Sequence, residues 1–203
     1  MVSHANSDSV LDLRDIGERS RREIMQTFLK RNGLSDRARV YAVLTLTLTS
    51  GRRRYRSRNS AESHAEVNML TFLRERHSHD DLKNQRIVMY ISTSPCYFCS
   101  RQIETLVADL GVTLELVLAG LHHINRPSSA PPTDHSYHHR NVCGLRGLQR
   151  VGVVIRTFSG QDWDTLATQV LLVDCFSYDG SQRQEEDEQL RMDLQSLLPG
   201  GNI

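Results

Sequence analysis

Two short segments constrain the fold of this chain more than any other feature. Residues 64–66 read His-Ala-Glu, and residues 95–99 read Pro-Cys-Tyr-Phe-Cys. Each lies where a loop or strand gives way to a predicted helix. Two thiolates separated by two residues at a helix start can hold one ion from one side, and the helix dipole favours the deprotonated sulfur. A third ligand from the other segment requires the fold to bring the two helix starts together.

The residue types indicate which ion this is. Two sulfurs and one imidazole suit zinc, and three protein ligands leave the fourth position for water. We therefore predict that His64, Cys96 and Cys99 bind zinc. Zinc lowers the pKa of bound water to about 7. Glu66 is then predicted to take the water proton and deliver it to a ring nitrogen and a leaving amine, because this pair of motifs resembles the signature of zinc-dependent deaminases.

Each segment also has a simpler interpretation when it is taken alone. Ser63 and Glu66 fit a capping box at a helix start. Cys96 and Cys99 fit a redox pair or half of a structural zinc site. A structural site needs a fourth ligand, whereas Cys143 and Cys175 have no paired cysteine nearby in the sequence. The two segments together, in this order, favour the deaminase chemistry.

The order of predicted elements indicates an α/β protein. We expect helices at 11–30, 63–76, 96–110, 141–150, 161–173 and 186–198, and strands at 39–50, 52–57, 87–92, 112–118 and 151–157. Strands that alternate with helices imply a parallel or mixed sheet covered by helices. Residues 1–10 are expected to be disordered, and residues 11–200 to form one domain, which fits the chain length of 203 residues.

The composition indicates the cellular compartment of the protein more clearly than it indicates a binding partner. The net charge is +1, so no overall field indicates nucleic acid, although five arginines crowd residues 52–58. The polar N-terminus has no signal-peptide pattern, and no apolar run is long enough to cross a membrane. The four cysteines are too few for a disulfide framework. We expect a protein of the cytoplasm or nucleus.

Further residues resemble those of one family, the AID/APOBEC polynucleotide cytosine deaminases. Residues 92–96 are similar to its Ser-Trp-Ser-Pro-Cys segment, and residues 144–153 to its Gly-Leu-x-x-Leu-x-x-Ala-Gly-Val passage. Residues 162–166 resemble its tryptophan-bearing helix. The resemblance covers roughly residues 24–173. It implies a five-stranded mixed sheet flanked by about six helices, and a target base that is unstacked into the zinc pocket.

The resemblance also implies substrate contacts. Asn59 falls where the family contacts the sugar of the target nucleotide, and Ser94 where a backbone carbonyl meets the exocyclic amine. His122 stands in place of a base-stacking tyrosine, and Thr93 in place of a tryptophan that walls the pocket. For Asn59 the alternative is a turn residue before the helix, and for Ser94 it is a residue that merely ends the strand.

Two basic stretches need separate interpretations. Arg52 and Arg54 are predicted to hold phosphates beside Asn59, in the way that basic grooves hold single strands. A charged hairpin edge that resists aggregation is the alternative. Five histidines between residues 122 and 139 raise the possibility of a second metal, but an exposed substrate-facing loop explains them with fewer assumptions: His122, His123, His135, His138 and His139.

The sequence therefore predicts a hydrolase that converts cytosine to uracil in single-stranded DNA with one zinc ion. Three alternatives stay open. In the first, the substrate is RNA. In the second, it is free deoxycytidylate, since residues 64–68 also resemble deoxycytidylate deaminases. The third is an inactive, zinc-stabilised nucleic-acid-binding module. The flanking-base preference, the oligomeric state and the biological role do not follow from the sequence.

Overall fold

The structure is a computed structural model that describes residues 9–30, 40–48, 51–122, 124, 135–173 and 180–198. It confirms a single α/β domain built on a mixed sheet. The strands are β1 (Val10–Asp12), β2 (Tyr41–Leu48), β3 (Gly51–Arg58), β4 (Arg86–Ile91), β5 (Thr113–Leu118) and β6 (Val154–Thr157), and they are hydrogen-bonded in the order β1-β3-β2-β4-β5-β6. The sheet has one strand more than expected, because residues 10–12 pair with β3 at its edge.

The sheet is antiparallel on one side and parallel on the other. β1, β3, β2 and β4 pair antiparallel, whereas β4, β5 and β6 pair parallel. The helices are α1 (Glu18–Leu29), α2 (Ala65–Arg76), α3 (His79–Leu82), α4 (Tyr97–Leu110), α5 (His135–Arg150), α6 (Gly160–Asp164) and α7 (Gly180–Leu197), with a 3₁₀ turn η2 (Leu13–Asp15) and a π-helical segment η4 (Thr165–Leu171).

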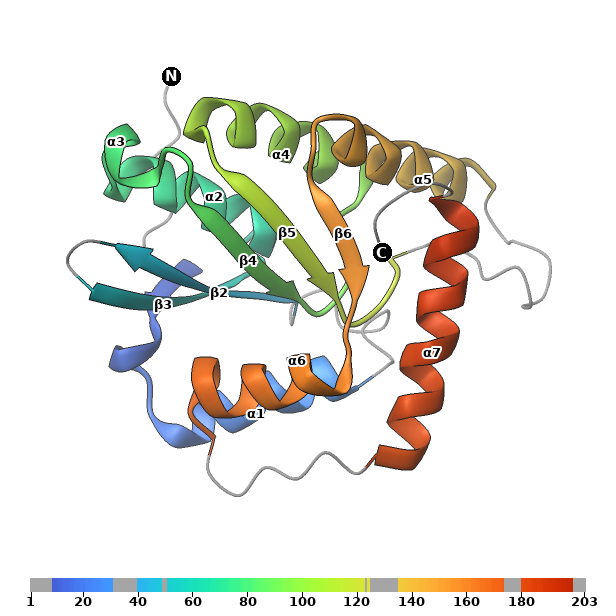
Figure 1. Ribbon diagram of the computed structural model, residues 1–203, viewed down its shortest axis with the longest axis horizontal. Coiled ribbons are helices and arrows are strands. Elements are labelled where there is room, and N and C mark those ends of the chain that lie inside the picture. Colours follow the sequence, from blue (N-terminus) through green and yellow to red (C-terminus); the bar gives the residue numbers. More distant parts are fainter. Residues whose placement is uncertain are drawn as a thin grey trace.

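The helices form a layer on each face of the sheet (Figure 1). α2, α4 and α5 lie on one face, α1 and α6 lie on the other, and α7 runs beside β6. The alternation in β2 produces this sandwich, since Leu44 and Leu46 pack toward α2 and α4 while Val43 packs toward Trp163 on the opposite face. Within the described residues no helix is both long and apolar enough to cross a membrane.

Three helices begin several residues away from their predicted starts. The stretch predicted as one helix over 11–30 is strand and 3₁₀ turn before Gly17, and the Asp12 side chain stabilises that turn by accepting the Arg14 N–H. α5 begins at His135 and not at Asn141, because the histidine-rich stretch before Asn141 continues the same helix. The C-terminal helix also begins earlier than expected, at Gly180.

α4 and α5 pack closely because small residues lie between them. A Cβ at Gly144 would come within 2.9 Å of the Ser100 hydroxyl and 3.2 Å of the Tyr97 Cα. A Cβ at Gly147 would meet the ends of two side chains, those of Glu104 and Arg150. The contact between Gly144 and Tyr97 involves the Tyr97 backbone, so Gly144 fixes how near α5 lies to the start of α4.

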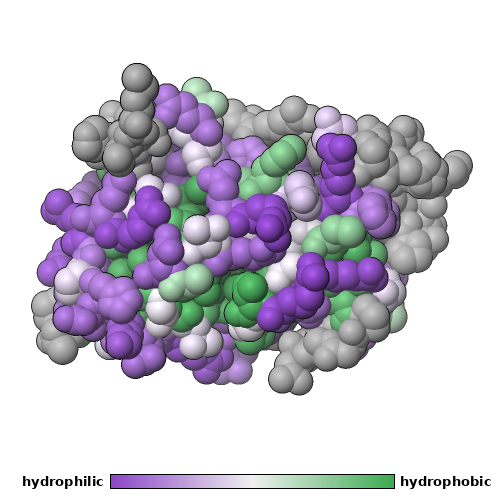
Figure 2. All heavy atoms as spheres, turned by 90° about the horizontal axis from the view of Figure 1, so that it is seen from above, coloured by the Kyte–Doolittle hydropathy of each residue, from purple (hydrophilic) through white to green (hydrophobic). Residues whose placement is uncertain are grey.

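Seen from the side of α4 and α5, polar side chains cover much of the surface, and apolar side chains show between them (Figure 2).

Candidate metal centre

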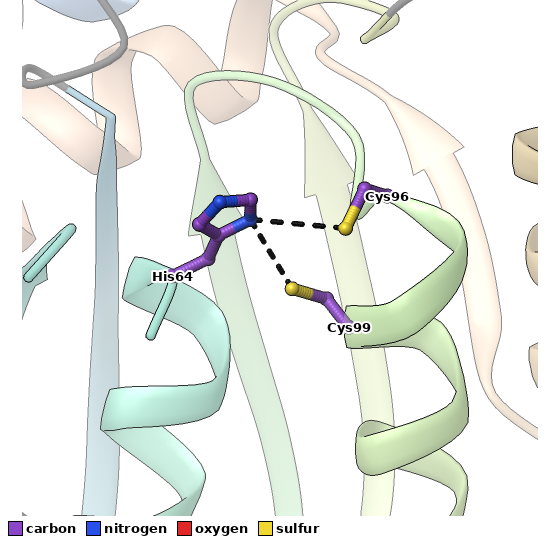
Figure 3. A group of neighbouring side chains, drawn as sticks. All are labelled: His64, Cys96 and Cys99. Carbon is purple, nitrogen blue, oxygen red and sulfur yellow. Dashed lines mark hydrogen bonds between the residues drawn. The ribbon is translucent and has the colours of Figure 1, made fainter. Parts of the chain in front are cut away.

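Two helix starts converge at the carboxyl-terminal end of β4. His64 is the N-cap of α2, Cys96 is the N-cap of α4, and Cys99 lies in the first turn of α4. The three side chains point toward one another (Figure 3). The His64 Nδ1 lies 3.2 Å from the Cys99 Sγ and 3.8 Å from the Cys96 Sγ. The carboxyl end of parallel strands is where open α/β sheets commonly bind ligands.

The spacing of these three atoms fits a zinc site. All three ligand atoms lie within 4.8 Å of one another. Tetrahedral zinc with bond lengths of about 2.0 Å to nitrogen and 2.3 Å to sulfur separates its ligand atoms by about 3.6 to 3.8 Å. The observed separations bracket that range. Among the residues that the structure describes, this is the one group of three or more potential ligand residues close enough to share an ion.

The two thiols share their protons unequally. The hydrogen bond from the Cys99 thiol lowers the pKa of Cys96 to about 3. The same hydrogen bond, together with burial, raises the pKa of Cys99. A metal ion binds the deprotonated sulfurs, which makes its affinity depend on pH.

The Glu66 carboxyl lies beside these ligands and away from solvent. The residue is 2% exposed, and Cys99 is among the groups that influence the pKa of its carboxyl. Burial raises its pKa, while its own backbone N–H and His64 act in the opposite direction. α2 has His64 and not Ser63 as its N-cap, and a buried Glu66 does not serve as the surface partner of a capping box. A buried carboxyl next to a metal group is suited to accept and return a proton.

Asn59 supports the start of α2. Its Oδ1 accepts the backbone N–H of Ala65 at 2.9 Å, one residue after His64. Asn68, one turn into the helix, donates through its side-chain nitrogen to the Arg58 carbonyl at 3.0 Å. The segment that ends β3 is thus tied to the helix that carries His64. This contact fits the alternative of a turn residue before the helix, and the contact of Asn59 with substrate stays a prediction.

Ser94 and His122 lie together on the loops that follow β4 and β5. The Ser94 N–H donates to the Gly120 carbonyl at 2.8 Å, and the Ser94 Oγ accepts the His122 N–H at 2.9 Å. Ser94 is buried, and His122 is partly exposed. Since Ser94 precedes Cys96 by two residues, these hydrogen bonds hold His122 near the metal ligands.

The arginines of β3 are spread along the strand and do not gather at the metal group. β3 runs from Gly51 to Arg58 and ends beside Asn59. At about 3.3 Å per residue, Arg52 lies about 20 Å from Asn59. Arg54 is in mid-strand, opposite Thr45, and donates to the Gln169 carbonyl at 3.3 Å. Only the Arg58 end of the strand therefore lies beside Asn59, and phosphate contacts by Arg52 and Arg54 stay predictions.

The second metal site considered for the histidine-rich stretch has no counterpart among the described side chains. His138 and His139 belong to α5, and the His139 Nε2 lies 3.6 Å from the Cys143 Sγ, which makes a pair and not a group of three. His123 and the His135 side chain lie outside the described residues, as does Cys175.

One residue near the site was missed by the sequence analysis. Asn141 is 3% exposed, and its side chain contacts both the Tyr97 and the His122 backbones. The only signal in the sequence was an asparagine in a predicted helix, where its polar side chain competes with the backbone. That signal gives no hint of what Asn141 contacts.

Comparison with known proteins adds one finding. The sequence profile of the APOBEC1 family matches residues 49–158, more than half of the chain. The matched range contains β3, α2, β4, α4, β5 and α5, and with them His64, Glu66, Cys96 and Cys99. No curated protein matches the chain.

Proposed function

This chain belongs to the APOBEC1 family of cytidine deaminases, and we propose that it hydrolyses cytosine to uracil in single-stranded DNA. His64, Cys96 and Cys99 bind one zinc ion in this proposal, and Glu66 is the catalytic acid and base. One observation carries it: three ligand atoms within 4.8 Å of one another, beside a carboxyl that is 2% exposed. A structural zinc site would use four protein ligands and would need no buried acid beside them.

Held by His64, Cys96 and Cys99, a zinc ion would supply a Lewis acid that activates water. Glu66 would accept a proton from the attacking water and transfer it to N3 of the cytosine ring. Hydroxyl addition at C4 and departure of the amine convert cytosine and water into uracil and ammonia. Glu66 carries the second proton to the leaving amine, so its carboxyl returns to its initial protonation state at the end of each cycle. Burial, which raises the pKa of Glu66, favours a carboxyl that can hold the proton between these steps.

The single-stranded substrate is supported by exposed cationic and ring side chains near the metal group. Arg58 is exposed at the end of β3, next to Asn59, and His122 is partly exposed near Ser94. A guanidinium group suits a phosphate, and an imidazole ring can stack on a base. Extruding a base costs less from a single strand than from a duplex. Arg52 and Arg54 extend the same basic strand away from the site.

The cellular compartment is part of the proposal. A reducing environment keeps Cys96 and Cys99 as thiols that can bind zinc. We therefore propose that the protein acts in the cytoplasm or the nucleus. A fluorescent fusion imaged in cells tests this, and secretion of the fusion would contradict it.

The test of the activity uses three substrates side by side. Purified protein is incubated with a cytosine-containing DNA oligomer, the matched RNA oligomer and free deoxycytidylate, and uracil is measured in each. We expect uracil in the DNA oligomer, and about 10²–10⁴-fold less with Glu66→Gln, the usual contribution of general acid–base catalysis. Product from RNA or from the free nucleotide alone would overturn the DNA proposal. Equal behaviour of the wild type and Glu66→Gln would overturn catalysis and leave a zinc-stabilised binding module.

A further inference from the structure

Two buried side chains hold the backbone of His122 from both sides. The Ser94 Oγ accepts the His122 N–H at 2.9 Å, and the Asn141 Nδ2 donates to the His122 carbonyl at 2.9 Å. Ser94 and Asn141 are each 3% exposed. Buried hydrogen bonds of this kind are costly to break, since the partner that remains is left unsatisfied. The peptide groups on both sides of the His122 ring therefore have fixed positions.

Asn141 also contacts the helix that carries two of the metal ligands. Its Oδ1 accepts the N–H of Tyr97 at 2.9 Å, and Tyr97 lies between Cys96 and Cys99 in the sequence. One orientation of the amide satisfies both contacts, because the oxygen must face an N–H group and the nitrogen must face a carbonyl. A single side chain thus links the metal-binding turn to the loop of His122.

The helix of Asn141 is itself held in place. Gly144, one turn farther along α5, lies where any Cβ would come within 3.2 Å of the Tyr97 Cα. The two helices consequently meet at backbone distance next to Asn141. Such packing leaves little freedom for the Asn141 side chain to move with respect to α4.

We propose that Asn141 and Ser94 are positioning residues that fix the His122 ring relative to the metal ligands. They set how tightly the target nucleotide binds and leave the proton transfers to Glu66. This inference rests on the proposed function, because it assigns to His122 a contact with the target base. Neither Ser94 nor Asn141 needs to touch the substrate through its side chain. An imidazole on a fixed backbone offers its ring to a base at a lower entropic cost than one on a loose loop.

The test measures KM and kcat for the DNA oligomer with Ser94→Ala and with Asn141→Ala. Each variant removes one of the hydrogen bonds to the His122 backbone. We expect KM to rise about tenfold, the usual effect of losing one buried hydrogen bond, while kcat stays within about twofold. Asn141→Asp replaces the alanine variant in this test if Asn141→Ala does not fold. It keeps the acceptor for the Tyr97 N–H and, when ionised at pH 8, loses the donor to the His122 carbonyl.

A double-mutant cycle separates positioning from general stability. In a His122→Ala background, Ser94→Ala and Asn141→Ala should each change KM by less than about twofold. Ser78→Ala is the matched control, because it removes a hydrogen bond to the Asp81 N–H at α3, at the other end of β4. It should lower thermal stability and leave KM unchanged.

Three outcomes would overturn the inference. Equal effects of the variants with and without His122 would show that they act elsewhere, and a fall in kcat at constant KM would assign them to the chemical step. If neither variant changed KM or kcat, Ser94 and Asn141 would have no role in positioning His122. Fluorescence anisotropy with labelled DNA in the Glu66→Gln background repeats the comparison without turnover. If the wild-type protein forms no uracil in any substrate, the proposed function has failed, and an intact coupling to His122 in the binding data would still support the positioning role.

Discussion

The side-chain oxygen of Asn59 accepts the backbone N–H of Ala65 at 2.9 Å. Asn59 directly follows β3, and Ala65 is the first residue of α2, directly after His64. This hydrogen bond satisfies one of the N–H groups that a helix start leaves without an intrahelical partner. It couples the position of His64 to a residue five positions earlier.

Replacement of Asn59 by alanine should therefore affect metal binding as well as substrate binding. We expect Asn59→Ala to lower the free energy of unfolding by about 1 kcal/mol, as loss of a helix-capping acceptor does, and to release zinc to a chelator more readily. Thermal melting and chelator titration measure the two effects. Asn59→Asp keeps an acceptor and should retain zinc. If Asn59→Ala changed only KM, the residue would be a substrate contact and nothing more.

The two glycines of α5 should respond differently to alanine. Gly144→Ala places a Cβ 3.2 Å from the Tyr97 Cα, so the start of α4 must shift. We expect a loss of about 1–3 kcal/mol of stability and weaker zinc binding. Gly147→Ala meets the movable ends of Glu104 and Arg150 and gains helix propensity, so it should be neutral or slightly stabilising. Denaturant titration of both variants decides this, and equal losses would contradict the packing argument.

Charge along β3 should matter most at the end beside Asn59. We expect Arg58→Gln to weaken binding of single-stranded DNA and to reduce the slope of log K against log salt by about 0.7. Arg52→Gln, on the same strand about 20 Å away from Asn59, should change the slope less. Anisotropy titrations at several salt concentrations give the slopes. If Arg52→Gln changed the slope more than Arg58→Gln, the phosphates would bind at the Arg52 end of β3 instead.

A buried carboxylate on β5 should make stability depend on pH. Burial alone would raise the pKa of Glu115, but hydrogen bonds from Arg86 and Arg156 hold it below its ordinary value. A lowered folded-state pKa stabilises the fold above the ordinary glutamate pKa of about 4.3, and that stability is lost as pH falls through the folded-state value. Asp162, which also pairs with Arg156, acts in the same direction.

Glu115→Gln should accordingly cost about 1–3 kcal/mol at pH 7 and much less at pH 3. Urea unfolding at both pH values measures the difference. Asp109→Asn is a suitable control, since that residue is exposed and its nearest described cation, Arg74, lies 3.7 Å away at the surface. An equal cost of Glu115→Gln at both pH values would show that the carboxylate charge contributes nothing.

The sequence predicted the central part of the fold because its periodicity is unambiguous there. The alternation of leucine and threonine in β2 predicted a strand with two different faces, and β2 and β3 pair as the expected hairpin. The glycine after Leu110 predicted the end of α4, where Gly111 adopts a φ of +62°. That His64, Cys96 and Cys99 lie close enough to share an ion was predicted from residue types and from the resemblance to a known signature.

The remaining features depend on contacts that periodicity does not encode. β1 is three residues long and exists only because β3 offers it a partner. The histidines at 138 and 139 suggested a loop, yet α5 continues through them. No local pattern could connect Asn141 to His122, 19 residues earlier.

The most direct test of the metal centre is zinc X-ray absorption spectroscopy on the purified full-length protein, with metal content measured in parallel. We predict one zinc per chain, with two sulfur ligands at about 2.3 Å and the remaining nitrogen and oxygen ligands at about 2.0–2.1 Å. His64→Ala and Cys99→Ser should each lose the metal. A shell of four sulfurs, or a folded protein that holds no zinc, would contradict this assignment of His64, Cys96 and Cys99.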